Sequence, residues 1–292
     1  MVQLLKNYLK PKEKPESSVS FEQLDSMEKR VQSLEAKARL FKPNSMSKAA
    51  QEMVTTIFRL ISPMDPKGLA FERVGRDFDG GYVQVKLPRQ GSIAYSVGIK
   101  RDVSWDLDMA NRGYQIFQYD HTISVLPQDH PNFNWVKLGI TGQSEMTKEL
   151  SSLPKELHKN NHLDIDDIVL KMDIEGHEWS VFGDIEPEDL CCFSQIMLEI
   201  HSLHQLHTLA QYRRARKALS KLHKTHQVVH VHGNNNTSLT IIGGTPVPPV
   251  MELTLVRRDL CEFETCSRTF PTELDQPNNP NYAEHILGSF RY

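Results

Sequence analysis

The sequence predicts an α/β protein whose mostly parallel sheet is covered on both faces. From residue 71 onward, short apolar segments alternate with segments of helical length, and this alternation is typical of a parallel sheet. The last two strand-like segments have no helix between them, so the final strand can run antiparallel. The 292-residue chain has 39% hydrophobic and 24% charged residues, as a globular protein does.

The individual strands are predicted from apolar runs and from apolar–polar alternation. In chain order they are 81–87, 92–99, 114–120, 133–140, 167–174, 193–201, 226–233 and 251–258. Helices are predicted over 102–113, near 144–158 and over roughly 208–224. Residues 236–250 are rich in glycine and proline, which predicts a loop.

Two helices are expected before the sheet begins. Residues 20–41 place apolar side chains three or four apart, which predicts either a coiled coil that pairs two copies of the chain or a helix lying on the main domain. A second helix, about 46–61, has a broad apolar face. The expected organisation is an N-terminal helical extension, a main domain and a tail: 1–66, 67–260 and 261–292.

Charge and hydropathy limit the classes of function. With 34 Lys and Arg against 37 Asp and Glu, the net charge is −3, so no basic field attracts nucleic acid. No apolar run is long enough to span a membrane. The first residues lack a signal-peptide cleavage site, which favours the cytoplasm. A chain trimmed at its N-terminus could instead be membrane-associated or belong to the secretory lumen.

Four cysteines are too few for a disulfide framework. Cys261 and Cys266 are close enough in sequence to form a bridge, but reduced thiols are the expected state.

Polar residues collect where the predicted strands end. In an open parallel sheet, ligands bind beyond the carboxyl ends of the strands. The residues at or near these ends are Ser96, Gly98, Asp120, Gly139, Asp173, Glu175, Glu199, His201, His232, Asn234 and Asn235. Residues two apart on a strand share a face. Asp173 with Glu175, and Glu199 with His201, are therefore predicted to point the same way.

The first two strand ends suggest a nucleotide-type cofactor. Asp120 follows Gly98 by 22 residues, close to the spacing at which an acid binds the ribose hydroxyls of such a cofactor. Asp120 could instead cap the turn after its strand. The turn has one glycine rather than the G-x-G-x-x-G of pyrophosphate binding. This disfavours NAD and favours S-adenosylmethionine, which needs a ribose acid, an adenine slot and a turn for its methionine part.

Two histidines are candidates for a general base. The pKa of histidine, about 6.5, suits removal of a hydroxyl proton near neutral pH. His201 could act with Glu199, which would orient the ring or bind the substrate. His232 is the second candidate, and Asn234 or Asn235 could hydrogen-bond the substrate. Both histidines could equally be loop residues whose tautomers are fixed by backbone carbonyls.

A divalent metal ion could replace such a base. Asp173, Glu175, His201 and His232 come from neighbouring strand ends and could together hold Mg²⁺ or Mn²⁺. A bound ion would lower the pKa of the reacting hydroxyl. His177 and Glu178 follow in the first turn of a helix and are expected to be solvated.

The segment "DGGY", residues 79–82, precedes a strand. Its two glycines predict a turn, and Tyr82 could either belong to that turn or cover the cofactor.

Four quoted segments carry a family resemblance. "RVGRDFDGGYV", "AYSVGIKRDVSWDLDMANRGYQIFQYD", "VLKMDIEGHEW" and "QIMLEIH" resemble the methyltransferase-like protein 24 family, related to the FkbM-type methyltransferases, over about residues 71–258. The resemblance implies a Rossmann-like class I fold with a seven-stranded sheet, an antiparallel seventh strand, and S-adenosylmethionine as cofactor. This chain departs from most methyltransferases in its glycine-poor first motif.

The resemblance also implies roles for particular residues. It places Gly98 and Asp102 in the cofactor turn, Asp120 at the ribose, and Asp173 and Glu175 at the edge of the reaction centre. Members of the family act on varied acceptors, often sugar hydroxyls.

The expected function is therefore O-methylation of a glycan or a small-molecule hydroxyl. A metal-dependent hydrolase that uses the carboxylate and histidine cluster is one alternative. A non-catalytic, methyltransferase-shaped module that forms homo-oligomers through residues 20–41 is the other.

Overall fold

The computed structural model describes residues 42–88 and 91–292. These residues belong to one compact unit. The predicted helix over 20–41 lies outside the described residues.

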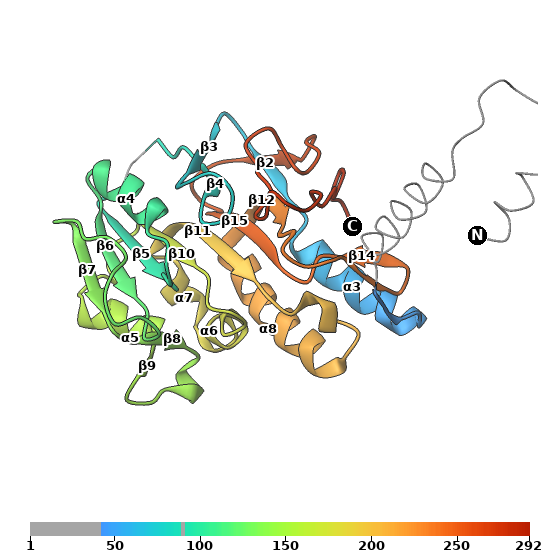
Figure 1. Ribbon diagram of the computed structural model, residues 1–292, viewed down its shortest axis with the longest axis horizontal. Helices are drawn as coiled ribbons and strands as arrows, with labels where there is room; N and C mark the ends of the chain where they lie inside the picture. Colours follow the sequence, from blue (N-terminus) through green and yellow to red (C-terminus); the bar gives the residue numbers. More distant parts are fainter. Residues whose placement is uncertain (1–41, 89–90) are drawn as a thin grey trace, which may run out of the picture. The chain divides into compact units, whose positions relative to one another are not determined.

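The centre of this unit is a seven-stranded sheet. Figure 1 labels its strands, from β7 at one edge to β12 at the other. In chain order its strands are β5 (Ile93–Val97), β6 (Gln115–Tyr119), β7 (Phe133–Val136), β10 (Ile168–Met172), β11 (Phe193–Ile200), β12 (His226–Gly233) and β15 (Met251–Arg257). Their spatial order is β12-β15-β11-β10-β5-β6-β7. Only β15, between β11 and β12, runs antiparallel to its neighbours in this sheet. This is the arrangement of the Rossmann-like class I methyltransferase fold, so the predicted fold class is confirmed.

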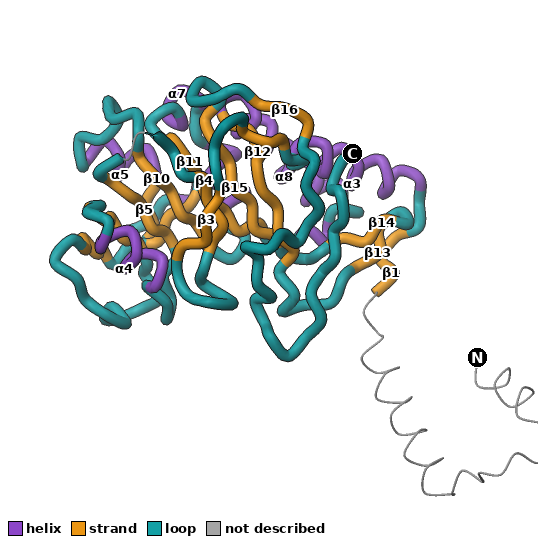
Figure 2. Tube along the Cα trace, turned by 90° about the horizontal axis from the view of Figure 1, so that it is seen from above, coloured by secondary structure: helices purple, strands orange, loops and turns teal. Residues whose placement is uncertain are grey.

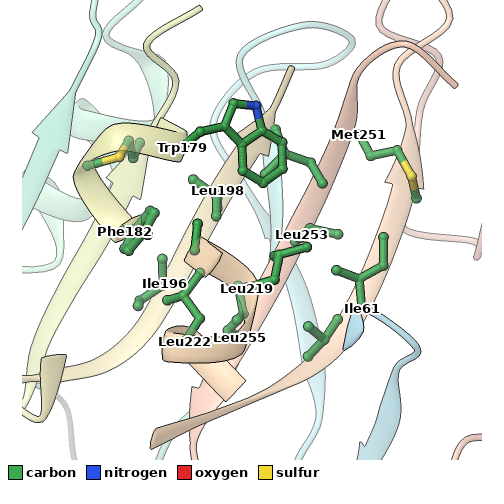
Figure 3. Packing of buried hydrophobic residues seen from close by; sticks show 14 of the residues in the cluster. Ile61, Trp179, Phe182, Ile196, Leu198, Leu219, Leu222, Met251, Leu253 and Leu255 are labelled. Atoms are coloured by element: carbon green, nitrogen blue, oxygen red, sulfur yellow. The ribbon is translucent and has the colours of Figure 1, made fainter. Parts of the chain in front are cut away.

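One face of the sheet is covered by helices. They are α3 (Lys48–Leu60), α5 (Leu153–Lys159), α6 (Glu178–Asp184), α7 (Pro187–Leu190) and α8 (Leu209–Thr225). Figure 3 shows Trp179 and Phe182 of α6 and Leu219 of α8 packed over side chains of β11 and β15. The helix predicted near 46–61 is α3; the Ser47 hydroxyl caps it by accepting from the Ala50 N–H at 3.1 Å.

The other face is covered by α4 (Ser104–Asn111) and the hairpin of β3 (Phe71–Val74) and β4 (Tyr82–Val85), which Figure 2 shows lying over the sheet. Trp105 and Met109 of α4 belong to the apolar cluster on this side. The Gln195 side chain of β11 pairs with both the N–H and the carbonyl of Val85, at 2.6 and 3.2 Å. Because both faces are covered, β10 and β11 are buried along their whole length, which explains why most of their residues are apolar.

Three predicted elements differ from the structure. The strand over 133–140 is two strands: β7 ends at Val136, and β8 (Gly139–Thr141) pairs with β9 (Leu150–Ser152) outside the main sheet. The range 144–158, predicted as one helix, contains a short 3-10 turn, η1 (Gln143–Glu145), then β9 and then α5. Pro154 lies in the first turn of α5, where proline is favoured, so the helix starts late.

The predicted loop over 236–250 contains a hairpin. Strands β13 (Thr240–Ile242) and β14 (Thr245–Val247) are joined by Gly243 and Gly244, both with positive φ, and β1 (Lys42–Ser45) pairs with β13. Glycines that adopt positive φ suit a tight hairpin turn. The glycines and prolines therefore mark a hairpin here. Outside these sheets, β2 (Met64–Pro66) pairs with β16 (Phe263–Thr265), and η2 (Leu203–Gln205) follows β11.

The C-terminal segment, residues 266–292, packs along β12 and reaches the carboxyl ends of the strands. Asp275 Oδ1 lies 2.8 Å from His230 Nε2. The Asn278 amide donates to Glu252 of β15 at 2.6 Å and to Asp79 at 3.2 Å. The segment therefore ties the DGGY turn to the main sheet.

All four cysteines are free thiols, so Cys261 and Cys266 are not bridged. Among the described residues, no helix is both long and apolar enough to cross a membrane.

His226, at the start of β12, is a fully buried neutral histidine. Its Nε2–H donates to the Phe193 carbonyl at 2.9 Å, and Nδ1 lies 2.9 Å from the Thr225 hydroxyl. Burial lowers the pKa of His226 to about 4.

We expect this histidine to destabilise the fold in acid. Its unfolded pKa is about 6.5, so its contribution to stability is complete above that pH and is lost progressively as the pH falls from about 6.5 to about 4. The loss amounts to at most about 3 kcal/mol. Urea denaturation at about pH 7, 5.5 and 4.5 should show a smaller fall in stability for His226→Gln than for the wild type. The exposed His158→Gln control should keep the wild-type pH dependence, and an unchanged pH dependence for His226→Gln would contradict the assignment.

Candidate active site

Two adjoining cavities lie at the carboxyl ends of β5, β6, β10 and β11. The larger, about 700 Å³, is lined by charged and polar side chains that include Asp79, Lys171 and Asn234. The smaller, about 300 Å³, has an apolar part made by Ile140 and Leu150. Both cavities are lined by Gly98, Lys100, Thr122, Asp173 and Glu175. These shared residues mark the junction between the cavities.

The turn after β5 requires glycine at position 98. Gly98 has φ +81°, and a Cβ built on it would lie 1.7 Å from the carbonyl oxygen of Asp173. Its N–H donates to Tyr119 O of β6 at 3.0 Å, and the Asp173 N–H donates to Val97 O of β5 at 2.9 Å. The ends of three neighbouring strands are therefore held in close contact at this point.

Asp120, at the end of β6, braces the two turns beside the smaller cavity. Its Oδ2 accepts from the N–H groups of Ile99 and Lys100 at 2.9 and 2.8 Å. Its Oδ1 accepts from the N–H and the hydroxyl of Thr122 at 2.7 and 2.6 Å. Burial acts to raise the pKa of Asp120, but these hydrogen bonds outweigh it and the pKa is lowered. A carboxylate has about four acceptor sites, so these four bonds within the chain occupy the acceptor capacity of Asp120.

His201 lies immediately after β11 and is surrounded by carboxylates. Its Nε2 lies 3.3 Å from Glu199 Oε1, 3.5 Å from Glu175 Oε2 and 3.7 Å from Asp173 Oδ1. The residues predicted to share faces are therefore close together, because all three carboxylates lie near Nε2 of His201.

The other side of the imidazole is held by Glu178. Its Oε1 lies 3.2 Å from His201 Nδ1 and accepts the His201 backbone N–H at 2.7 Å. Its Oε2 accepts the Gly176 N–H at 2.8 Å. The Glu178 side chain is fully buried, so the prediction that it is solvated is wrong. The exposed His177 agrees with that prediction.

These neighbours determine the charge on His201. Burial acts to lower its pKa, but the carboxylates, Glu178 and Glu199 foremost, outweigh burial and raise the pKa to about 10. Burial raises the pKa of Glu199 to about 8, and burial also raises the pKa of Asp173.

A donor set for a metal ion is present within this cluster. One ligand atom from each of Asp173, Glu199 and His201 lies within 4.8 Å of the others. Asp173 Oδ1 is buried and accepts no hydrogen bond from the described residues. Glu178 accepts from Nδ1 of the histidine, as the hydrogen-bonding partners of metal-binding histidines do.

The structure separates His232 from this cluster. His232 Nδ1 lies 3.1 Å from Glu252 Oε2, and Nε2 lies 3.3 Å from Glu284 Oε1 in the C-terminal segment. The Asn235 side chain donates to the Asn279 carbonyl in that segment, at 2.9 Å. Asn234 faces the larger cavity and donates to Glu199 at 3.3 Å.

The remaining predicted residues have more varied positions. Ser96 is buried inside β5. Asp102 Oδ1 accepts the Ser104 N–H at 2.8 Å and so supports the start of α4. Tyr82 lines the larger cavity. Gly139 lines the smaller cavity but begins β8 rather than ending β7.

Two lysines that line the larger cavity, Lys100 and Lys171, are not among the site residues predicted from the sequence. Lys171 is buried, its Nζ donates to the Gly98 carbonyl at 2.7 Å, and it lies 5.7 Å from the Tyr82 ring centroid. Lys171 lies two residues before Asp173 at the end of β10, and this spacing is the feature of the sequence that indicates a place in the site.

The strand order and the cavities at the strand ends are those of a Rossmann-like methyltransferase fold. More particularly, residues 87–226 match the family model described as the methyltransferase FkbM domain. That range is 140 of the 292 residues, and it contains both cavity-forming turns and the His201 cluster.

Comparison with curated proteins found no match. Among solved structures, a TehB-like SAM-dependent methyltransferase from Corynebacterium glutamicum is 10% identical, with a TM-score of 0.32, over 58% of this chain and 82% of that one. A variant of the 16S rRNA (adenine(1408)-N(1))-methyltransferase from Catenulisporales acidiphilia is 14% identical, with a TM-score of 0.32, over 59% and 88%. At such TM-scores, neither likeness bears on function.

Proposed function

We propose that the protein is an S-adenosylmethionine-dependent methyltransferase that methylates a hydroxyl of a glycan or small molecule. The observation that carries this proposal is the meeting of an apolar-ended cavity and a polar cavity at Gly98 and Asp173. Methyl transfer needs two ligands that are separately bound but in contact at one point. The residues of the K-M-D-I-E-G stretch favour the methyltransferase-like protein 24 group within the FkbM-related enzymes.

The smaller cavity suits the cofactor. Ile140, Leu150 and Ile174 offer an apolar slot for adenine, and Asp120 lies beside it for the ribose. The ribose hydroxyl would take the place of the Thr122 hydroxyl at Asp120 Oδ1. The sulfonium then lies near the Gly98 turn, next to the larger cavity.

The larger cavity suits a hydroxyl-rich acceptor. Asp79, Glu199 and Asn234 line it with hydrogen-bonding groups, as recognition of a sugar or another polar molecule requires. In the reaction, the hydroxyl oxygen forms the new C–O bond, the C–S bond breaks with its electron pair going to sulfur, and the hydroxyl proton is released to water. Rate enhancement then comes from in-line positioning and from removal of that proton.

Asp173, Glu199 and His201 are proposed to hold a divalent ion, Mn²⁺ or Mg²⁺. Two carboxylates and one imidazole suit these ions, and the imidazole shifts the preference toward Mn²⁺. When bound, the ion supplies a positive charge that lowers the pKa of a nearby hydroxyl. The chain itself holds the imidazole ring through Glu178 and positions Asp173 through the Gly98 contact.

Calorimetric titration of the full chain tests this proposal. We expect micromolar binding of S-adenosylmethionine and S-adenosylhomocysteine, and tighter or newly measurable acceptor binding when Mn²⁺ is added. NAD, whose pyrophosphate needs more glycine in the turn, is the negative control. A folded protein that binds neither adenosyl compound, with or without Mn²⁺, would contradict the proposed function.

A further inference from the structure

An ion pair lies at the junction of the two cavities. Lys100 Nζ contacts Glu175 Oε1, and both residues line both cavities. Lys100 belongs to the turn after β5, and Glu175 belongs to the turn after β10. Each side chain is about half exposed, at 55%. The pair therefore belongs to the junction of the two cavities.

The backbone presents these two side chains in an unusual way. Lys100 has φ 48° and Glu175 has φ 56°, a left-handed conformation that residues other than glycine seldom adopt. Asp120 holds the Lys100 N–H, and the buried Glu178 holds the N–H of the next residue, Gly176. Strain at two facing positions is typical of a ligand-binding site.

Stability does not account for this arrangement. An exposed ion pair contributes only about 0–1 kcal/mol, whereas each left-handed residue costs about 1–3 kcal/mol. Glu175 Oε2 also lies 3.5 Å from His201 Nε2, so Glu175 keeps a second polar contact when Lys100 exchanges its partner. The pair can therefore open without leaving Glu175 isolated.

We propose that Lys100 and Glu175 form the receptor for the amino-acid end of the cofactor. This assignment rests on the proposed function. The methionine part of S-adenosylmethionine carries one carboxylate and one ammonium group. On binding, Lys100 exchanges Glu175 for the carboxylate, and Glu175 exchanges Lys100 for the ammonium. Charge balance is preserved, because the carboxylate of the zwitterion takes the place of Glu175 beside Lys100, and its ammonium group takes the place of Lys100 beside Glu175.

The shape of the smaller cavity supports this orientation. Its apolar end, at Ile140 and Leu150, suits adenine, and its charged end is the Lys100–Glu175 junction. A cofactor laid along it has adenosine at one end and the amino acid at the other. The sulfonium between them then faces the larger cavity beside Asp173.

A pair of ligands distinguishes this role from a structural one. S-adenosylhomocysteine has the amino-acid end, whereas 5′-methylthioadenosine has the same adenosine and thioether without it. By calorimetry on the full chain, Lys100→Met and Glu175→Gln should each weaken S-adenosylhomocysteine about tenfold, as expected for loss of one hydrogen bond between charged groups. Binding of 5′-methylthioadenosine should stay within about twofold of the wild type.

The matched control is an exposed pair away from the cavities. Lys67 Nζ lies 3.0 Å from Glu262 Oε2, and Lys67→Met and Glu262→Gln should leave both affinities unchanged. Equal weakening of both ligands by Lys100→Met would show that Lys100 only supports the turn, and this would overturn the assignment. Unchanged binding of S-adenosylhomocysteine would overturn it too. A wild-type protein that binds neither ligand would instead contradict the proposed function itself.

Discussion

Asp173→Ala is expected to abolish methyl transfer while cofactor binding is largely kept. Asp173 belongs to the proposed metal-binding cluster and faces the larger cavity, and its Oδ1 has no hydrogen-bond partner among the described residues. Loss of assistance to proton removal should slow turnover by about 10²–10⁴-fold. Turnover is measured as release of S-adenosylhomocysteine with an acceptor found by screening glycans and small polyols. Cofactor binding is measured by calorimetry.

Asp120→Ala is the matched contrast. It removes the bonds that hold the turns at Ile99, Lys100 and Thr122, so we expect weakened cofactor binding as its main effect. Thermal unfolding of both variants separates these effects from loss of the fold. Near-normal turnover by Asp173→Ala would show that the proposed role of Asp173 is wrong.

Glu178→Ala is expected to destabilise the protein strongly. The side chain is fully buried and accepts the N–H groups of Gly176 and His201 besides contacting the imidazole. Its removal leaves the N–H groups of Gly176 and His201 without their acceptor, which costs about 1–3 kcal/mol for each group. For a domain of this size the Tm should fall by roughly 10 °C, measured by circular dichroism.

Two variants make this result specific. Glu178→Gln keeps an oxygen for one backbone N–H and should cost less stability than Glu178→Ala. Glu186→Ala removes an exposed glutamate that lies 3.3 Å from Lys221, and the Tm should hardly change. If Glu178→Ala had the wild-type Tm, the buried carboxylate would have no part in holding the strand ends.

The parts of the site that could be predicted from the sequence follow from strand geometry. The buried runs of β10 and β11 identify two central strands, and a period of two predicts that Glu199 and His201 share a face. The carboxyl ends of neighbouring parallel strands meet at one edge, so Asp173 and Glu175 are also predicted to lie near His201. Both residues follow the end of β10, however, and Glu175 reaches His201 from a left-handed turn that strand geometry does not predict.

The rest depends on contacts between distant segments. Nothing local in "GHEW" distinguishes a buried glutamate from an exposed one; Glu178 is buried because the left-handed turn at Glu175 and Gly176 directs it under His201. His232 resembles His201 as a polar residue at a strand end. However, His232 contacts Glu284 of the C-terminal segment, and the pattern of strands does not predict that this segment lies beside His232.

The close contact between Gly98 and the carbonyl of Asp173 restricts which residues of the site can be substituted. Residues at the junction of the two cavities are constrained, whereas residues that line one cavity alone are free to vary. No side chain fits at position 98, and the residues around it line both cavities. A change made there to suit a new acceptor would therefore also alter the proposed cofactor cavity. Arg76 and Asn234 line the larger cavity alone. Acceptor preference can therefore diverge at such rim positions between related proteins while the junction stays the same.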